Sequence, residues 1–392
     1  MDRARINEGV RRMRFEDLLW RQKRGELGQE AAAEILGISD RTFRRWRDRL
    51  RDEGPAGLSD RRLSPSNRRV SMVEIERMLG LYRSRYVGFT VKHFHEQLVK
   101  RHDYKLGYTV TKVHLQRSGL VVRATKRSAH RKKRPRRPMV GMMLHQDASM
   151  HAWLAGDVGK HDLVVTLDDA TSAIYSAFLV EEEGTASTFR GLQEVVDAHG
   201  LACSLYTDRG SHYFYTPKAG EKVSKTILTQ VGRALEQLGI EHIAAYSPEA
   251  RGRSERAFLT LQDRLPKELV MAGITTVEAA NRWIAKVYIP QHNAAFAVEA
   301  EDPGSAFVAD SKRLSPEILC IHQERTVGND NTIKWRKMSL QLPPSRLRPH
   351  FVKATVRVHE YPDGRIAVFL GPNRLADYDA TGAIDVTTRI AA

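Results

Sequence analysis

Three carboxylates stand where strands and a helix are expected to begin or end, and their chemistry suits metal binding. Asp147 lies inside or at the end of an expected strand, Asp208 directly follows another strand, and Glu255 lies near the start of a helix. Strand ends on one side of a sheet converge, and hard divalent cations need oxygen ligands. Such carboxylates can hold two ions about 4 Å apart, one activating the attacking oxygen of a phosphodiester and one stabilising the leaving oxygen. The pattern predicts phosphoryl transfer.

The helix that carries Glu255 offers two competing acidic residues. Glu249 precedes the helix in a loop, and Glu268 lies roughly 20 Å beyond Glu255 if the helix is continuous. We therefore expect Glu255 alone to face the site. One face of this helix consists of Arg251, Glu255, Phe258 and Leu259. The apolar pair on that face is expected to pack on the sheet and fix the direction of the carboxylate.

Other aspartates near the first carboxylate are interpreted as turn residues, because aspartate side chains readily hydrogen-bond to the backbone of a turn. They are Asp157, Asp162, Asp168 and Asp169.

A change of composition at Met139 marks the part of the chain that must position the three carboxylates. Apolar runs with strand periodicity alternate there with helical patterns. Three strands followed by alternating helices and strands predict a mixed α/β sheet covered by helices. The first strand begins at 139–144, two strands flank the turn 168–171, a helix covers 186–199, a strand 202–206, a helix 226–238 and a strand 241–246.

Charge is distributed unevenly along the chain. The 392 residues carry a net charge of +16 and have a pI near 9.9. Through Pro138 there are 36 basic and 16 acidic residues, a balance of +20, whereas the remaining 254 residues carry −4. A positively charged N-terminal third of this kind predicts a nucleic-acid-binding region joined to a domain that does not share its charge.

Residues 1–52 have the pattern of a helix-turn-helix domain. Helical periodicity over Gln29–Leu36 and Asp40–Leu50 is interrupted by Gly37, and Ser39 is a suitable N-cap for the later helix. An apolar face of that helix should pack on the preceding helix and the turn. The side chains expected in this contact are Phe43, Trp46, Leu50, Ile35 and Ile38.

The opposite face of the same helix carries arginines that would point outward. Arg41, Arg44 and Arg45 are assigned to DNA binding, because a guanidinium can bridge two acceptors on a guanine edge and can also hold phosphates. This makes 40–50 the predicted recognition helix.

A basic linker over 53–69 is followed by a second helical unit over 70–122, in which 109–118 is another candidate recognition helix. Both helical units are expected to be all-α. We assign no metal to the histidines of this unit, because zinc sites of this kind need cysteine partners that are missing. Those histidines are His93, His95, His102 and His114.

Residues 123–138 form a basic arm or linker that cannot build a core. It is expected to neutralise phosphates along a duplex, to tether two domains, or to do both. The arm residues assigned to DNA are Lys132, Lys133, Arg134, Arg136 and Arg137.

The two cysteines, Cys203 and Cys320, lie 117 positions apart, so neither a disulfide framework nor a cysteine-based zinc site is predicted. No apolar run approaches the ~20 residues needed to cross a bilayer. We therefore expect a soluble, cytosolic protein without a membrane partner.

Three segments around the carboxylates resemble the signatures of the DDE transposase and retroviral-integrase superfamily. They are LHQDAS, YTDRGS and YSPEARGRSERAFLTLQDRL. Within that superfamily the chain is similar to transposases of bacterial insertion sequences, which place helix-turn-helix units ahead of an integrase-type core. The likeness extends over nearly the whole chain.

This resemblance implies a ribonuclease-H-like catalytic core over 139–303 and assigns Asp147, Asp208 and Glu255 as the catalytic, metal-binding carboxylates. Gly252 and Arg253 match the pair that such transposases commonly place before the glutamate. The segment containing Tyr288, His292, Asn293 and Phe296 is similar to the end of such cores. One departure is the 46 residues between Asp208 and Glu255, which indicate an added loop over about 212–226 of unassigned role.

Residues 304–392 are expected to form a linker and a small C-terminal β-barrel. The turn at Pro362-Asp363-Gly364 joins two alternating runs within 353–370 as a hairpin. Similar transposases carry such a barrel, which could contact DNA or another subunit, or only brace the core.

Together these features predict a DNA transposase that binds terminal inverted repeats, cleaves the ends of an element and joins the 3′-hydroxyl to target DNA. Two Mg²⁺ ions, replaceable by Mn²⁺, would serve the reaction. Bridging two ends of double-stranded DNA calls for a homodimer or a larger assembly. The alternatives are a DNA-binding transcriptional regulator with an inactive core and a structure-selective nuclease. The repeat and target sequences, the subunit number and the route of second-strand cleavage are not encoded in any recognisable pattern.

Overall fold

The computed structural model describes residues 3–59, 70–123, 134–156, 159–217, 222–224, 226–246, 252–344 and 348–384. The chain divides into two compact units, Met1–Ser84 and Arg85–Ala392, which we describe separately. In the described part, no helix is both long and apolar enough to span a membrane.

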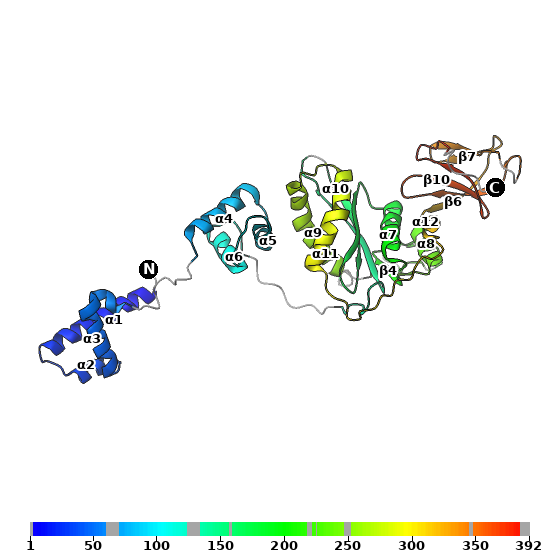
Figure 1. The fold of residues 1–392 in the computed structure, drawn as a ribbon. Coiled ribbons are helices and arrows are strands. Elements are labelled where there is room, and N and C mark those ends of the chain that lie inside the picture. Colours follow the sequence, from blue (N-terminus) through cyan, green and yellow to red (C-terminus); the bar gives the residue numbers. More distant parts are fainter. Residues whose placement is uncertain are drawn as a thin grey trace. The chain divides into compact units, whose positions relative to one another are not determined.

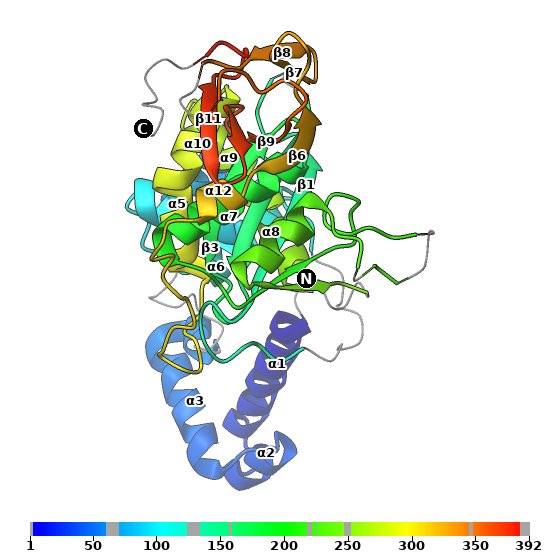
Figure 2. The same ribbon diagram turned by 90° about the vertical axis from the view of Figure 1, so that its right-hand side faces the viewer.

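Three helices of the first unit pack around one small apolar core. They are α1 (Arg3–Lys23), α2 (Gln29–Ile35) and α3 (Asp40–Glu53), and α2 lies between the adjoining ends of the other two (Figure 2). Phe15 of α1 is fully buried and meets Phe43 and Trp46 of α3 edge-on. The packing of the outer helices against each other therefore fixes the angle of α3.

The boundaries of α3 have clear local causes. The Ser39 side chain accepts a hydrogen bond from the Thr42 amide, as predicted for an N-cap, and the preceding Gly37 has a φ of +66°, which a residue without Cβ adopts readily. Ile35 is wrongly placed by the sequence pattern: it is 61% exposed, and the contact with α3 comes from Ala32, Ala33 and Ile38. A 3₁₀ turn, η1 (Gly54–Leu58), follows α3, and α4 (Met72–Arg85) ends this part of the chain.

Two helices begin the second unit. In α5 (Val91–Arg101) the hydroxyl of the N-cap Thr90 accepts from the His93 amide, and Phe94 and Leu98 are fully buried. In α6 (Tyr108–Arg117) the buried Thr111 hydroxyl donates to Tyr104. The two helices pack against each other.

A five-stranded sheet in the order β3-β2-β1-β4-β5 forms the centre of the second unit. β1 pairs antiparallel with β2 and parallel with β4, so the first three strands form a meander and the last two run parallel to the central strand. This is the mixed α/β arrangement expected from the sequence. The strands are β1 (Leu144–His151), β2 (His161–Asp168), β3 (Ile174–Val180), β4 (Ser204–Thr207) and β5 (Glu241–Ala244).

Helices cover both faces of this sheet (Figure 1). Leu163 and Leu167 of β2 belong to the core shared with α9, α10 and η4, whereas Leu144 and Leu205 belong to the core shared with α7 and α8. The helices are α7 (Thr185–His199), α8 (Gln230–Leu238), α9 (Gly252–Met271), α10 (Val277–Trp283), the π-helical turn η4 (Ile284–Tyr288), α11 (Ile289–Phe296) and α12 (Ser315–Ile318).

Asparagine side chains complete the edge strand β3. Asn293 accepts from the Ile174 amide and donates to the Ile174 carbonyl, both at 2.8 Å, and Asn281 makes the same pair of bonds with Leu179. Each carboxamide thereby satisfies backbone groups that a further strand would otherwise pair. This gives Asn293, in the segment similar to the end of integrase cores, a structural role.

The C-terminal region is β-rich, but the expected barrel is not confirmed, because the described strands form no closed barrel. They make a four-stranded sheet in the order β11-β10-β9-β6 and a separate hairpin of β7 and β8, which share one apolar core. The predicted hairpin at Pro362-Asp363-Gly364 is confirmed, since it joins β9 to β10. The strands are β6 (Ile321–Thr326), β7 (Thr332–Trp335), β8 (Met338–Gln341), β9 (Thr355–Glu360), β10 (Ile366–Leu370) and β11 (Asn373–Tyr378).

Candidate active site

The pairing of β1 with β4 places two of the predicted carboxylates side by side. His145 is in register with Tyr206 in this parallel pair, and their rings lie 5.1 Å apart. Continuing the register by two residues sets Asp147 beside Asp208, the first residue after β4. Neighbouring strands are about 4.8 Å apart, and residues in register point to the same face. Asp147 and Asp208 therefore share one edge and one face of the sheet.

Alternate residues of β1 identify which face this is. His145 meets Asp169, which Arg253 of α9 also contacts, and Ser149 accepts a hydrogen bond from Gln262 of α9 at 2.9 Å. Asp147 lies midway between these two positions and has the same parity, so its side chain is on the α9 side of the sheet. It is 8% exposed.

The same contacts locate the first turn of α9 relative to Asp147. From Arg253 to Gln262 the helix rises by about 13.5 Å, and from His145 to Ser149 the strand rises by about 13 Å. Helix and strand therefore run in the same direction, and Glu255, two residues after Arg253, lies within about one helical turn of the level of Asp147. Glu255 is exposed, whereas the adjacent Ser254 is buried.

The other two acidic candidates on or near this helix have different positions. Glu249, like Arg251, lies outside the described residues. The helix continues through Pro266, and Glu268 near its far end bonds to His93 and Gln97 of α5, at 2.7 and 2.8 Å. On the predicted apolar face, Phe258 is buried, but Leu259 is 69% exposed and does not pack on the sheet.

Asp169 lies in the turn after β2, as predicted, but its carboxylate is fully buried. The carboxylate of Asp168 bonds within that turn, where it accepts from the amide and the hydroxyl of Thr171. Asp169 instead accepts from His145 and Arg253, both at 2.7 Å, and also from Arg134. It therefore connects the central strand, the helix that carries Glu255 and the end of the basic arm.

The electrostatics of this cluster favour a charged Asp169. Burial raises its pKa, but the hydrogen bonds from His145 and the Arg137 amide and the positive charge of Arg253 outweigh burial, leaving the pKa below its usual value. For His145, burial has the larger effect and lowers the pKa, although Asp169 opposes this. Two features of the sequence point to this cluster: the adjacent aspartates Asp168 and Asp169, and the Gly252-Arg253 pair that resembles the one before the glutamate in similar transposases.

The arginines at the end of the arm, Arg134, Arg136 and Arg137, have protein partners. Arg136 donates to the carbonyls of Asp169 and Ala170, at 3.0 Å each, and to the Ser172 hydroxyl at 2.8 Å. Arg137 contributes its backbone amide to Asp169 at 2.7 Å. The arm thus ends against the turn between β2 and β3. Lys132 and Lys133, also assigned to DNA, lie outside the described residues.

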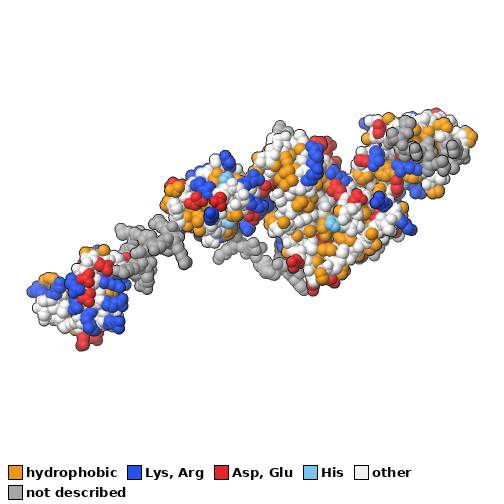
Figure 3. Space-filling model, viewed as in Figure 1, with side chains coloured by type: hydrophobic (Ala, Val, Ile, Leu, Met, Phe, Trp, Pro, Cys, Tyr) orange, Lys and Arg blue, Asp and Glu red, His pale blue; other side chains and the backbone are white. Residues whose placement is uncertain are grey.

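The predicted recognition helix presents its arginines to solvent. Arg41, Arg44 and Arg45 of α3 are all exposed, and Arg44 pairs with Asp40 at 2.8 Å. Basic side chains crowd the visible surface of this unit (Figure 3). These arginines are sterically accessible to a nucleic acid.

The carboxylates of Asp147 and Asp208 are suitable ligands for Mg²⁺ and Mn²⁺, the ions that the resemblance to transposases implies. Asp147 and Asp208 each lie two residues beyond the paired His145 and Tyr206, and they offer oxygen donors, which Mg²⁺ and Mn²⁺ prefer over nitrogen or sulfur. The donor set at this sheet edge therefore fits a hard divalent cation.

Comparisons with known proteins agree with the motifs. A helix-turn-helix domain family matches residues 18–66. The chain is 29% identical, over 88% of its length and 75% of the relative's, to y4bF, a candidate transposase of Sinorhizobium fredii. It is 34% identical, over 42% of its length and 34% of the relative's, to the transposase for insertion sequence IS1202 of Streptococcus pneumoniae. The predicted resemblance to transposases is confirmed: this chain combines a helix-turn-helix match with a mixed α/β core and is homologous to bacterial transposases.

Solved structures with some likeness include the HTLV-2 integrase catalytic core domain in complex with magnesium, at 15% identity and a TM-score of 0.29 over 37% of this chain and 85% of that one. Another is the simian T-cell lymphotropic virus intasome in complex with a PP2A regulatory subunit, at 14% identity and a TM-score of 0.32 over 67% and 84%. These likenesses are remote, and the strand order described above is what defines the core.

Proposed function

We propose that this protein is a DNA transposase that binds terminal inverted repeats, cleaves the ends of its element and joins the freed 3′-hydroxyl to target DNA. The observation that carries the proposal is the register that sets Asp147 beside Asp208 on the face covered by the helix of Glu255, in a chain homologous to transposases. Exposed arginines on α3 would supply the recognition of the repeats.

Asp147, Asp208 and Glu255 would hold the metal ions. Two bound Mg²⁺, or Mn²⁺ in their place, would supply Lewis-acid activation of the attacking oxygen and stabilisation of the leaving oxygen. The chain itself would orient the scissile phosphate between the sheet edge and α9. Water would attack phosphorus in the cleavage step and displace the 3′-oxygen, which leaves as a hydroxyl. In the joining step that hydroxyl would attack a target phosphodiester, forming a new phosphodiester bond and displacing the 3′-oxygen of the target strand as a hydroxyl.

Arg253 and Asp169 would help by fixing the first turn of α9. Because Asp169 bonds to both β1 and α9, it would keep Glu255 level with the strand carboxylates. Joining two ends to one target would also require a homodimer or a larger assembly on DNA.

A supercoiled-plasmid assay with Mg²⁺ tests this function. We expect nicking and strand transfer on a plasmid carrying the terminal repeats, and neither reaction with Asp147→Asn. Specific repeat binding without any cleavage by the native protein would instead indicate a regulator with an inactive core. Cleavage of branched or flapped DNA without strand transfer would indicate a structure-selective nuclease.

A further inference from the structure

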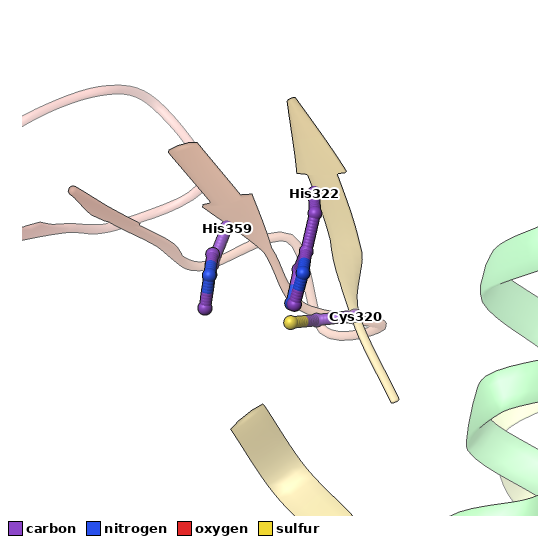
Figure 4. Close-up of side chains that lie close together, drawn as sticks. All are labelled: Cys320, His322 and His359. Atoms are coloured by element: carbon purple, nitrogen blue, oxygen red, sulfur yellow. The ribbon is translucent and has the colours of Figure 1, made fainter. Parts of the chain in front are cut away.

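Three potential metal ligands meet in the C-terminal region, away from the predicted catalytic carboxylates. Cys320 immediately precedes β6, His322 is the second residue of that strand, and His322 is in register with His359 of β9. One donor atom from each lies within 4.8 Å of the others (Figure 4). Cys320 is fully buried, and His359 is 5% exposed.

We propose that Cys320, His322 and His359 form a binding site for one borderline-soft transition-metal ion, with Zn²⁺ as the physiological candidate. A thiolate and two imidazoles are ligands that Zn²⁺ prefers, and hard ions such as Mg²⁺ bind poorly to them. Three protein ligands leave a fourth position for water.

Hydrogen bonds set each imidazole in a tautomer that leaves one nitrogen available. His359 Nδ1 lies 3.1 Å from the Glu317 carboxylate, so that nitrogen carries the proton, and its Nε2 is buried without a hydrogen-bond partner. His322 Nε2 lies 2.8 Å from the Glu317 carbonyl, which only accepts, so the lone pair of His322 is on Nδ1. A carboxylate behind a histidine is the usual outer support of a metal ligand.

The surroundings hold Glu317 in place for this role. Its carboxylate accepts from the Tyr361 hydroxyl at 2.7 Å and from Arg374 at 3.0 Å. The Cys320 thiol donates to the Glu317 carbonyl at 3.2 Å, and this is the proton that metal binding would release to solvent. One residue at the end of α12 thus contacts all three proposed ligands.

Capture of the ion requires a small rearrangement. The two imidazoles are stacked, with centroids 3.9 Å apart and planes within 8°, so their lone pairs do not yet converge. In a tetrahedral zinc site the ligand atoms lie roughly 3.5 Å apart. A turn of the His322 ring about its Cβ–Cγ bond, which exchanges the bond from Nε2 to the Glu317 carbonyl for the metal, and a contraction of about an ångström would bring the donors together.

Local charge slightly opposes a cation, because Arg357 adds a positive charge near His322 to those of two other arginines. Arg233 donates to the Cys320 carbonyl at 2.6 Å, and Arg374 is next to Glu317. Glu317 and Asp377, which also pairs with Arg374, offset those two charges. Selection would therefore come from the sulfur and nitrogen donors, so the site should take Zn²⁺ or Co²⁺ in an excess of Mg²⁺.

A bound ion would fasten the junction between the core and the C-terminal sheet. Gln230 of α8 bonds to both backbone groups of His322, so β6 is already attached to the core at this point. Linking β6 to β9 through a metal would stabilise the C-terminal sheet against unfolding. The role is structural and does not depend on the proposed transposase chemistry.

Metal titration of the full-length protein tests the site. Chelator-stripped protein is titrated with Zn²⁺ and Co²⁺ in excess Mg²⁺, so that carboxylate sites are occupied. We expect one Zn²⁺ per chain, a thiolate-to-cobalt absorption band, and a higher melting temperature with Zn²⁺. Cys320→Ser should abolish the band, and Cys203→Ser, the matched control, should keep it. Glu317→Gln should weaken Zn²⁺ binding by about 10–100-fold.

Thiol protection tests the wild-type chain without any substitution. In a denaturant concentration that transiently opens the C-terminal sheet and lets the buried Cys320 react, Zn²⁺ should slow its alkylation, measured by mass spectrometry, and leave exposed Cys203 unaffected. No Zn²⁺-dependent protection of Cys320, or a cobalt spectrum that persists in a Cys320→Ser protein with native circular dichroism, would overturn the proposal. Neither readout depends on DNA cleavage, so the result is independent of the proposed function.

Discussion

Arginine side chains have different environments in the two compact units. On α3 of the first unit, Arg41, Arg44 and Arg45 are exposed to solvent. In the core, Arg134 and Arg253 bind the buried Asp169 and connect separate elements. The difference teaches that positive charge alone does not identify a DNA contact: exposed arginines are free to meet DNA, whereas those paired with a buried carboxylate connect parts of the fold. Recognition and chemistry should therefore be separable by mutation.

Removal of the divalent cation should have the largest effect on activity, because the proposed chemistry of the core needs the ion and repeat binding by α3 does not. Removing Mg²⁺ with EDTA should abolish cleavage and strand transfer, while footprints on terminal repeats persist. Mn²⁺ should restore both reactions, and the larger Ca²⁺ should allow assembly with little product. Full activity in EDTA, or with Zn²⁺ as the only effective ion, would rule out the carboxylate site.

Asp169→Asn should have the next largest effect, since it weakens the connection between β1 and α9. We expect joining to fall by about 10–100-fold, the range seen when supporting partners of metal ligands are changed, and repeat binding to stay within about twofold. The control is Asp363→Asn, in the exposed turn before β10. Gel assays measure joining and repeat binding. Equal losses of joining and of repeat binding would contradict the assignment of chemistry to the second unit and of repeat recognition to the first.

Replacing Arg44 and Arg45 together with alanine should have the opposite profile. Specific binding should weaken by about 1–3 kcal/mol for each lost base contact, while cleavage at saturating protein is retained. Arg51→Ala, in the last turn of the same helix, is the matched control. Unchanged footprints in the double variant would show that α3 is not the recognition helix.

The smallest expected effect is the pH dependence that Asp169 gives to the free energy of unfolding. Because the folded-state pKa of Asp169 is below its ordinary value, its charge stabilises the fold above about pH 4, the usual aspartate pKa, and this stabilisation is lost as pH falls through the lower folded pKa. Denaturant unfolding should show the wild type more stable than Asp169→Asn at pH 7, with the gap narrowing in acid. A constant gap would mean that Asp169 is not charged when folded.

Local patterns predicted the elements well, because their causes lie within a few residues. Ser39 caps α3 as its position suggests, and the succession of strands and helices in the core follows from the alternating apolar runs. The predictions that Ile35 and Leu259 are packed in a core were wrong, because apolar character alone does not say which side of a helix is covered.

The Asp169 cluster could not be predicted, because its partners are 24, 35 and 84 positions away. Both Asp168 and Asp169 are fully buried. No feature of the neighbouring sequence shows that Asp169, rather than Asp168, has distant partners. Cys320 and His322 likewise meet His359 only through the pairing of β6 with β9. The closed barrel was not confirmed, since hairpin signals fix neighbouring strands but not closure of a sheet.

The central claim is that Glu255 completes the site of Asp147 and Asp208, and joining of a pre-cleaved 3′-hydroxyl end in Mg²⁺ tests it most directly. Glu255→Gln keeps the side-chain shape but removes the charge, whereas Glu268→Gln changes the same helix where it meets α5. We predict that Glu255→Gln binds the terminal repeat normally and joins no detectable DNA, while Glu268→Gln retains most activity. Robust joining by Glu255→Gln would remove this residue from the site and contradict the account.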